Sequence, residues 1–370
     1  MLVSAKKKIV FSFILFFFAV FLFEGVGHIL YRLTKGVFLW ESENKRAHVF
    51  RIREFTELVN DERFVTNKKN FTGNSEGFVI ETDANGFRVG SNRYFSDKEN
   101  IVFLGDSVPF GWGVDGAYSV PSLCYDMLKK NFPERYGVIN VAIPSYSLYQ
   151  AIQRYEIEIR GKYPVKVVIL QTYDPVTQFV IWGRKWNERM SWTSGNTLLA
   201  TKNILGEYNR GASFLNKYSM LFHMFITRIL PQRGMSSHLK LTDQAAFDLF
   251  EKENLSLLES FYQLLQKDHA TLVLVPMNPM RQHPSCTDTF VNKELVVINR
   301  LNEVFRKFAS SKQDVYFFDV RSYFGQFEPI ERRELFLNGL HDGLHLSETG
   351  APKQAAFIVQ ELLKNGLVGK

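Results

Sequence analysis

A serine stands where a buried strand is expected to give way to a helix. The apolar run of residues 101–104 leads through a Gly-Asp pair into Ser107, and a run of this kind is typical of a buried parallel strand. A hydroxyl at such a turn lies at the carboxyl edge of the sheet, where helix N–H groups can stabilise negative charge. This placement suits a nucleophile. The alternative is that Asp106 and Ser107 simply cap a helix.

A second group of candidate residues lies near the C-terminus. Asp342 stands three residues before His345, and this spacing allows the carboxylate to meet the imidazole. The contact would fix the tautomer of the ring and stabilise the imidazolium that forms when the ring removes a proton from a serine. His341 is a competing base, but it has no carboxylate at the same offset. The alternative is an ordinary turn in which Asp342 caps the last helix.

A third polar segment follows the second expected strand and reads Asn140-Val-Ala-Ile-Pro-Ser145-Tyr-Ser-Leu-Tyr-Gln150. A loop at this point can present a backbone N–H to the oxygen of a tetrahedral intermediate. The alternative is a strand-to-helix turn in which serines cap the helix.

The rest of the chain alternates between strand and helix patterns. Apolar runs typical of buried strands cover residues 100–104, 137–142, 165–170, 270–275 and 315–320. Helical spacing covers residues 121–130, 247–267 and 293–309. This alternation predicts a parallel sheet with helices on both faces, and ligands of such sheets bind at the carboxyl ends of the strands.

Together these segments resemble the SGNH, or GDSL-type, hydrolase family. The matching blocks are Gly105-Asp106-Ser107, the segment 140–147, Asp342-Gly-Leu-His345 and, as in membrane-anchored members, Asn85-Gly86-Phe87-Arg88. The likeness spans residues 80–365 as ordered landmarks. It implies a flavodoxin-like three-layer α/β/α sandwich in which Ser107 is the nucleophile, Asp342 and His345 complete the triad, and the Ser107 N–H contributes to an oxyanion hole. It implies neither a metal nor a cofactor.

Two departures from the family pattern affect the expected oxyanion hole. Ser145 replaces the glycine of the second block, although its backbone N–H remains available. The third block, usually G-x-N-D, reads Gln171-Thr-Tyr173-Asp174, so Tyr173 replaces the donating asparagine. Losing one donor typically costs about 10²–10³ in rate. Either the Tyr173 hydroxyl or the Gln171 amide replaces it, or activity is weakened, or the chain is a non-catalytic relative.

Residues 176–245 interrupt the alternation and predict an insertion over the carboxyl ends of the strands. Trp182, Trp186 and Trp192 could stack on sugar rings or pack on an acyl chain, or they form the core of a lid. Trp182 is therefore a candidate substrate-binding residue. Arg281, after the fourth strand, could meet an anionic group, and an exposed arginine is the ordinary alternative.

The N-terminus predicts a membrane anchor. Lys6-Lys7-Lys8 precedes an apolar stretch, residues 9–31, that is long enough to span a bilayer. Lysines on that side favour an N-in orientation, so the globular part would face the periplasm or the cell exterior. A cleaved signal peptide is the alternative, but no clear small-x-small site follows Phe23. Glu24 is expected near the outer interface.

The composition excludes some classes of function. The 370 residues are 45% hydrophobic and 22% charged, as in a folded protein. The net charge of +7 is spread along the chain without a dense basic run among aromatics, so nucleic-acid binding has little support. An anionic membrane surface or acidic polymer remains compatible. Cys124 and Cys286 could form one bridge in an oxidising compartment, but two cysteines this far apart are more often independent buried thiols, and no zinc pattern is present.

We therefore expect an anchor in residues 1–31, a polar lead-in segment in 32–98 and a hydrolase-like domain in 99–368. The expected function is ester hydrolysis through an acyl-enzyme on Ser107. Its substrate would be an O-acyl or O-acetyl group of an extracytoplasmic glycan or lipid. The alternatives are an O-acetyltransferase acting on a cell-surface polysaccharide, and a non-catalytic binding protein on the same scaffold.

Overall fold

The computed structural model describes most of the chain outside the predicted insertion. The described residues are 5–35, 54–59, 61, 63, 65–75, 77–144, 146–172, 244–277, 289–337 and 344–369. They fall into two compact units, one containing the N-terminal helix and the other containing the described residues from 54 onward.

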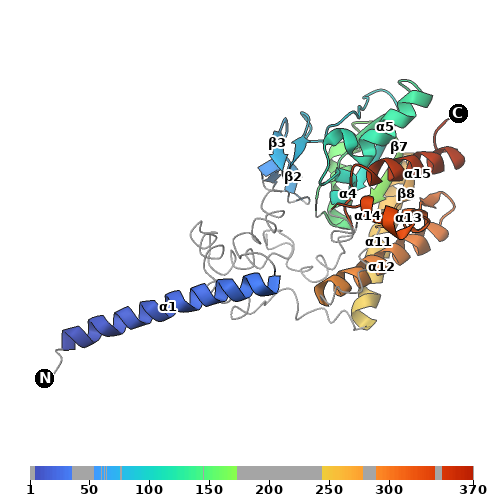
Figure 1. Cartoon of the computed structure of the whole chain (residues 1–370). Coiled ribbons are helices and arrows are strands. Elements are labelled where there is room, and N and C mark those ends of the chain that lie inside the picture. Colours follow the sequence, from blue (N-terminus) through green and yellow to red (C-terminus); the bar gives the residue numbers. More distant parts are fainter. Residues whose placement is uncertain are drawn as a thin grey trace. The chain divides into compact units, whose positions relative to one another are not determined.

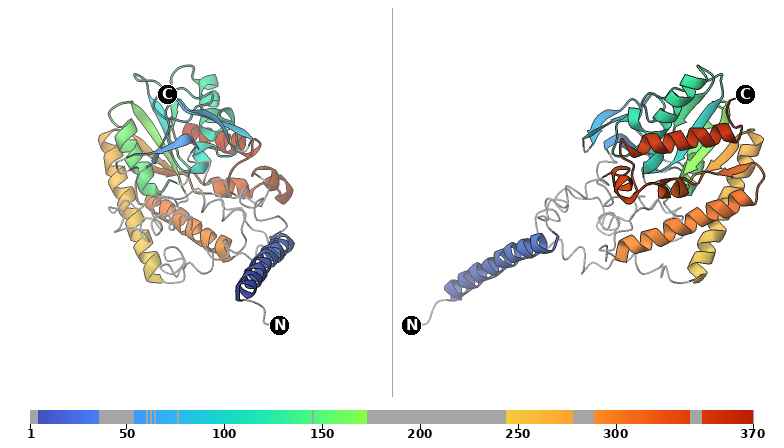
Figure 2. Two further views of the ribbon diagram at one scale, coloured as in Figure 1. Left: turned by 90° about the vertical axis from the view of Figure 1, so that its left-hand side faces the viewer. Right: turned by 45° about the vertical axis from the view of Figure 1, so that its right-hand side comes forward.

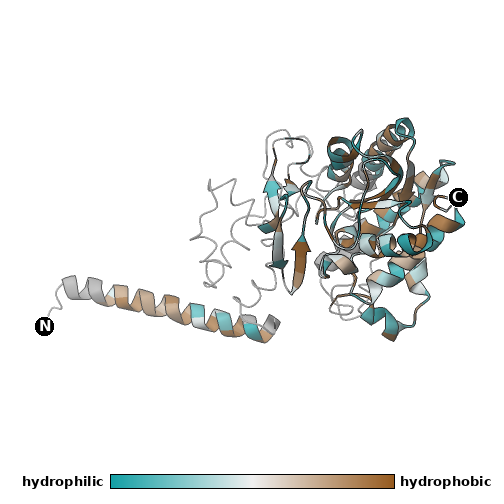
Figure 3. Ribbon diagram, turned by 90° about the horizontal axis from the view of Figure 1, so that it is seen from above, coloured by the Kyte–Doolittle hydropathy of each residue, from teal (hydrophilic) through white to brown (hydrophobic). Residues whose placement is uncertain are grey.

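The N-terminal unit is described through a single long helix, α1 (Ala5–Lys35). Its stretch Phe11–Leu30 is long and apolar enough to cross a membrane, and its hydrophobic residues appear in brown in Figure 3. Glu24 lies one helical turn before His28, with 3.9 Å between Oε2 and Nε2. A membrane-spanning helix is thus compatible with the length and composition of α1.

The second unit is built on a five-stranded parallel sheet. Its strands are β5 (Asn100–Gly105), β6 (Gly137–Asn140), β7 (Val165–Gln171), β8 (Thr271–Leu274) and β9 (Val315–Phe317). They lie in the order β6-β5-β7-β8-β9, and each neighbouring pair is parallel. This is the flavodoxin-like strand order, in which the second strand is added on one side of the first strand and the later strands are added on the other side. Every residue of β5 is buried, as expected for a central strand covered on both faces.

Helices cover both faces of the sheet (Figures 1 and 2). The long ones are α5 (Val120–Asn131), α6 (Leu148–Arg154), α11 (Gln244–Lys267), α12 (Thr289–Ser310) and α15 (Gly350–Lys364). On one face, α5 and α15 pack against each other and against the alternate sheet side chains that include Ile101 and Phe103. On the other, α11 contacts α6, α12 and β8. The predicted three-layer α/β/α sandwich is confirmed.

Among the strands, the predicted and observed ends differ most at β9. The sequence predicts a strand over residues 315–320, but β9 ends at Phe317 and Val320 begins the helix α13 (Val320–Gly325). The Asp319 side chain accepts a hydrogen bond from the Ser322 N–H at 3.0 Å and so caps this helix. Because an N-cap aspartate satisfies a free helix N–H, it starts a helix inside an apolar run.

Two short antiparallel hairpins precede the sheet, within the segment that the sequence shows only as polar and mixed. They are formed by β1 (Thr56–Leu58) with β2 (Val65–Asn67), and by β3 (Thr72–Ser75) with β4 (Phe78–Glu81). Phe55, Phe78 and Ile80 form a second apolar cluster there. The other side of that cluster is Phe110 and Trp112, which follow Ser107 in the chain. The hairpins therefore pack beside the chain segment of the candidate nucleophile.

A buried ion network joins the first hairpin to the sheet domain. Glu158 lies in the π-helical turn η2 (Tyr155–Ile159) and accepts a hydrogen bond from Arg154 Nε at 2.8 Å. Its other carboxylate oxygen accepts one from Thr66 Oγ1 at 3.1 Å and pairs with Arg63. The Arg154 side chain is fully buried, so this carboxylate balances a cation that has no access to water.

We expect Glu158→Gln to lower the free energy of unfolding by about 3–5 kcal/mol, because it leaves a buried guanidinium without its counter-charge. Urea denaturation at neutral pH measures this change. Glu303→Gln is the matched control, since it breaks an exposed pair with Arg306 that is expected to contribute less than about 1 kcal/mol. Equal denaturation midpoints for the two variants would contradict a stabilising role of the network.

Cys124 is buried in the main core and is a free thiol. Its Sγ lies 3.7 Å from the Ala355 carbonyl oxygen, and burial raises the pKa of the thiol. It therefore behaves as a small core hydrophobe, which agrees with the expected independent thiol. Cys286 lies outside the described residues.

Candidate active site

Ser107 lies directly beyond the carboxyl end of the central strand. It is the first residue of a short helix, α4 (Ser107–Phe110), and Asp106 is the N-cap whose side chain accepts a hydrogen bond from the Val108 N–H at 3.2 Å. The Ser107 carbonyl accepts one from the Trp112 N–H at 2.9 Å. Both interpretations of the Asp-Ser pair thus apply in part, since Asp106 caps the helix and Ser107 remains available for chemistry.

The turn between β5 and Ser107 requires glycine at position 105. Gly105 has φ +136°, a conformation that side-chain-bearing residues rarely adopt. A Cβ on this residue would lie 1.7 Å from the backbone oxygen of Gln171 in the neighbouring strand. Glycine therefore lets β5 and β7 approach closely at the point where the chain turns toward Ser107.

His345 is held by a short pairing of two chain segments ahead of α15. Its backbone oxygen accepts a hydrogen bond from the Leu337 N–H at 2.9 Å, and Phe336 pairs with Leu346 in an antiparallel bridge. Gly350, where α15 begins, lies so close to Leu335 that a Cβ would be 2.0 Å from the Leu335 oxygen. These contacts fix the backbone at His345 and in the residues that follow it.

The two candidate side chains meet although 238 positions separate them in the sequence. The distance from Ser107 Oγ to His345 Nε2 is 2.8 Å, which is hydrogen-bond reach. Ser107 is buried and His345 is half-buried. With the ring proton on Nδ1, Nε2 can accept the hydroxyl hydrogen. The arrangement has the geometry that activation of a serine by a neighbouring base requires.

Two polar side chains at neighbouring strand ends hold the surrounding turns in place. Asn140 Nδ2 donates to the Pro109 carbonyl in α4 at 2.9 Å, so the end of β6 is tied to the helix of Ser107. Gln171 Nε2 donates to the Pro276 carbonyl at 3.3 Å, and Gln171 Oε1 accepts from Gln354 Nε2 at 2.9 Å. The Gln171 amide, one of the two replacements considered for the missing oxyanion donor, is thus engaged in joining β7, the end of β8 and α15.

The other predicted site residues lie outside the described part of the chain. They are Asp342, Ser145, Tyr173, Trp182 and Arg281, together with His341, Trp186 and Trp192. Among the described residues, no group of three or more His, Cys, Asp or Glu side chains is placed to hold a metal ion. The structure therefore brings together Ser107 and His345, and the roles of the remaining residues stay predictions.

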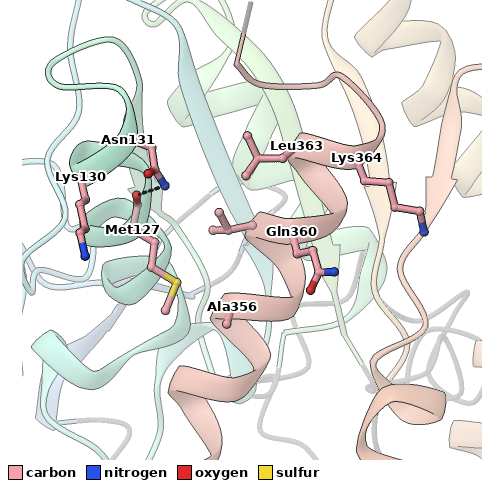
Figure 4. A pocket seen from close by; sticks show the side chains of 8 residues that line it. Met127, Lys130, Asn131, Ala356, Gln360, Leu363 and Lys364 are labelled. Carbon is pink, nitrogen blue, oxygen red and sulfur yellow. Dashed lines mark hydrogen bonds between the residues drawn. The ribbon is translucent and has the colours of Figure 1, made fainter.

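A groove between α5 and α15 lies elsewhere in the same domain (Figure 4). It has a volume of about 720 Å³ and is lined by Met127, Lys130, Asn131, Ala356, Val359, Gln360, Leu363 and Lys364. These residues lie in the C-terminal half of α5 and from the middle of α15 onward, whereas His345 precedes the N-terminus of α15. The groove is therefore separate from the Ser107–His345 pair.

Comparison with known proteins gives similarity in structure alone. No family model and no curated protein matches the chain. The similar solved structures include TesA (12% identity, TM-score 0.41, covering 73% of this chain and 100% of TesA). They also include Axe2, an acetylxylan esterase from Geobacillus stearothermophilus (12%, 0.40, 73% and 96%), and a lipase/acylhydrolase from Enterococcus faecalis (14%, 0.39, 72% and 96%). Because the identities and TM-scores are this low, we assign the flavodoxin-like fold from the strand order of this chain. We infer the chemistry from the residues of this chain.

Proposed function

We propose that the chain is a serine esterase of the SGNH type that uses Ser107 as nucleophile. The observation that supports this most is the 2.8 Å separation of Ser107 Oγ and His345 Nε2 at the carboxyl end of the central strand. Covalent catalysis requires the nucleophile and its base to be in hydrogen-bond contact. A binding protein on the same scaffold does not need this contact.

In the proposed reaction, Ser107 Oγ attacks the carbonyl carbon of the ester while His345 Nε2 takes the hydroxyl proton. The tetrahedral intermediate collapses, and the imidazolium returns the proton to the departing alcohol. Water then attacks the acyl-enzyme while His345 Nε2 takes its proton. The second tetrahedral intermediate collapses, the proton returns to Ser107 Oγ, and the acid is released. Asp342, in the role that the D-x-x-H spacing predicts, would hold the Nδ1–H side of the ring and stabilise the imidazolium.

The oxyanion hole of this proposal combines backbone and side-chain donors. The Ser107 N–H belongs to the first residue of α4, and the Ser145 N–H and Tyr173 hydroxyl would complete the hole. Because a phenol takes the place of the usual asparagine amide, we expect turnover below that of an enzyme with all three usual donors.

The substrate that we propose is an O-acyl or O-acetyl group of an extracytoplasmic glycan or lipid. The helix α1 is suited to a bilayer, and the three lysines at positions 6–8 would hold its N-terminus on the cytoplasmic side. The Ser107 domain would then work outside the cytoplasm, as a protein tethered through a single helix. Axe2 is described as an acetylxylan esterase, and an acetylated polysaccharide is a natural first substrate to test.

The experiment is an assay of the full chain in detergent, with p-nitrophenyl acetate and with an O-acetylated polysaccharide, measuring p-nitrophenol and free acetate. We expect both products from the wild-type protein. An unacetylated acceptor glycan added to the same reaction separates hydrolysis from transfer, since a transferase enriches the acetylated acceptor. If the wild-type chain and Ser107→Ala released equal amounts of product from every ester, the catalytic proposal would be contradicted.

A further inference from the structure

Arg88 is a buried cation with few partners. Its side chain is 1% exposed, and Nη2 donates to the Val79 carbonyl at 2.8 Å and the Val114 carbonyl at 3.2 Å. Among the described residues, Nε and Nη1 have no hydrogen-bond partner. Burial lowers the pKa of Arg88 to about 10, against opposing effects of Asp115 and Glu81. Arg88 is therefore still a cation at neutral pH, and burying it costs free energy that a purely structural apolar residue would not.

Two of the side-chain contacts of Arg88 lead to the segment that carries Ser107. The guanidinium carbon lies 4.9 Å from the centre of the Phe110 ring, and Phe110 is the last residue of α4. Val114, whose carbonyl Arg88 binds, lies in the loop that follows this helix. A cation over an aromatic face is attracted by the ring, and the attraction increases when both groups are desolvated. Arg88 thus holds the C-terminal end of the four-residue helix that begins at Ser107.

Further contacts hold the same helix. The Arg88 N–H donates to the Asn140 carbonyl at 3.0 Å, and Asn140 Nδ2 in turn donates to the Pro109 carbonyl at 2.9 Å. The ring of Phe55 stacks on Phe110 with a centroid separation of 5.3 Å. The hairpin segment and Arg88 together therefore hold α4, whose own backbone bonds are too few to fix it.

We propose that Arg88 is a positioning residue, which sets the direction of Ser107 Oγ toward His345 by fixing α4 through Phe110 and Val114. This inference rests on the proposed function, because the geometry it maintains is that of the nucleophile–base pair. It also gives the segment ahead of the sheet a part in catalysis, since Val79 and Arg88 both belong to that segment.

The test compares Arg88→Met and Arg88→Lys with the wild-type chain. Methionine is also unbranched, but it is uncharged and cannot bind the two carbonyls or the ring as a cation, whereas lysine keeps the positive charge and can donate to a carbonyl. Because a small misplacement of a reacting group can cost about 10²-fold, we expect kcat for p-nitrophenyl acetate to fall by about 10- to 100-fold in Arg88→Met, with KM little changed. Arg88→Lys should recover part of the loss.

The control is Leu265→Ala. Leu265 is a fully buried residue of α11, on the face of the sheet that α5 and α15 do not cover. It is expected to destabilise the fold but to leave kcat unchanged at temperatures where the protein is folded. Amide hydrogen exchange of residues 105–114, measured on all variants, provides a readout that is independent of activity. We expect faster exchange there in Arg88→Met and wild-type exchange in Leu265→Ala.

Two results would overturn the inference. One is unchanged kcat in folded Arg88→Met, and the other is unchanged exchange of residues 105–114. Failure of the proposed function gives a different pattern, in which the wild-type chain shows no Ser107-dependent turnover at all while the exchange difference persists.

Discussion

Replacing Ser107 by alanine is expected to lower the rate of p-nitrophenyl acetate hydrolysis by about 10⁴-fold or more, as removal of a triad member does in serine hydrolases. The physical reason is that the hydroxyl at 2.8 Å from His345 Nε2 is the atom that forms the acyl-enzyme. His345→Ala removes the base and is expected to cause a loss of similar size. The double variant should be little worse than either single one, because the two side chains act as a unit.

Ser260→Ala is the matched control for these measurements. Ser260 lies exposed in α11, and its hydroxyl donates within the same helix to the Ser256 carbonyl. It should therefore retain the wild-type rate. If Ser107→Ala also retained it, the hydrolysis would have another origin, and the account of Ser107 as nucleophile would be contradicted.

Replacing Gly105 by alanine is expected to lower the free energy of unfolding by about 2–6 kcal/mol. Two costs add up. Alanine at a positive φ is strained by about 1–3 kcal/mol, and overpacking costs about 1–3 kcal/mol. The overpacking arises because the new Cβ would meet the Gln171 backbone oxygen at 1.7 Å, in the middle of the sheet. Backbone of a central strand cannot move aside as a surface side chain can. Urea denaturation and the yield of folded protein measure the effect.

Gly161→Ala separates the two costs. Gly161 also has a positive φ, +69°, but a Cβ there would meet nothing within 4 Å. Only the dihedral cost of about 1–3 kcal/mol is expected at this position. Similar destabilisation by the two substitutions would show that the close approach of β5 and β7 contributes nothing.

The sheet and its long helices follow from the sequence because their signals are continuous. Strands buried on both faces read as apolar runs, and the runs at 100–104 and 165–170 lie within β5 and β7. The run at 315–320 misleads, since Asp319 ends the strand pattern by capping α13. An apolar run alone does not distinguish the end of a strand from the first turn of a helix.

The hairpins ahead of the sheet could not be predicted, because strands of three or four residues are too short to show a period. The sequence identifies Asn85–Arg88 as a block that resembles the family, and in the structure Asp83 Oδ1 accepts hydrogen bonds from the N–H groups of Asn85 and Phe87 in this block. That Arg88 is buried against Phe110 depends on tertiary packing, for which the sequence holds no local signal.

Part of the candidate site was accessible from the sequence and part was not. Ser107 and His345 could be paired because each stands at a landmark with a defined place in the expected fold. The role of Gln171 could not be foreseen, since its amide is bound to Gln354, 183 positions away. The side chain of Asn140 was likewise visible only as part of a polar loop, and the structure shows it tied to α4.

Activation of Ser107 as a nucleophile by His345 can be measured by treating the full chain with a fluorophosphonate. The adduct is then located by mass spectrometry of the intact protein and its peptides. We expect one adduct per chain on Ser107, absent in Ser107→Ala and formed far more slowly in His345→Ala. No adduct on the folded wild-type chain, an adduct on another residue, or equally fast labelling without His345 would contradict it.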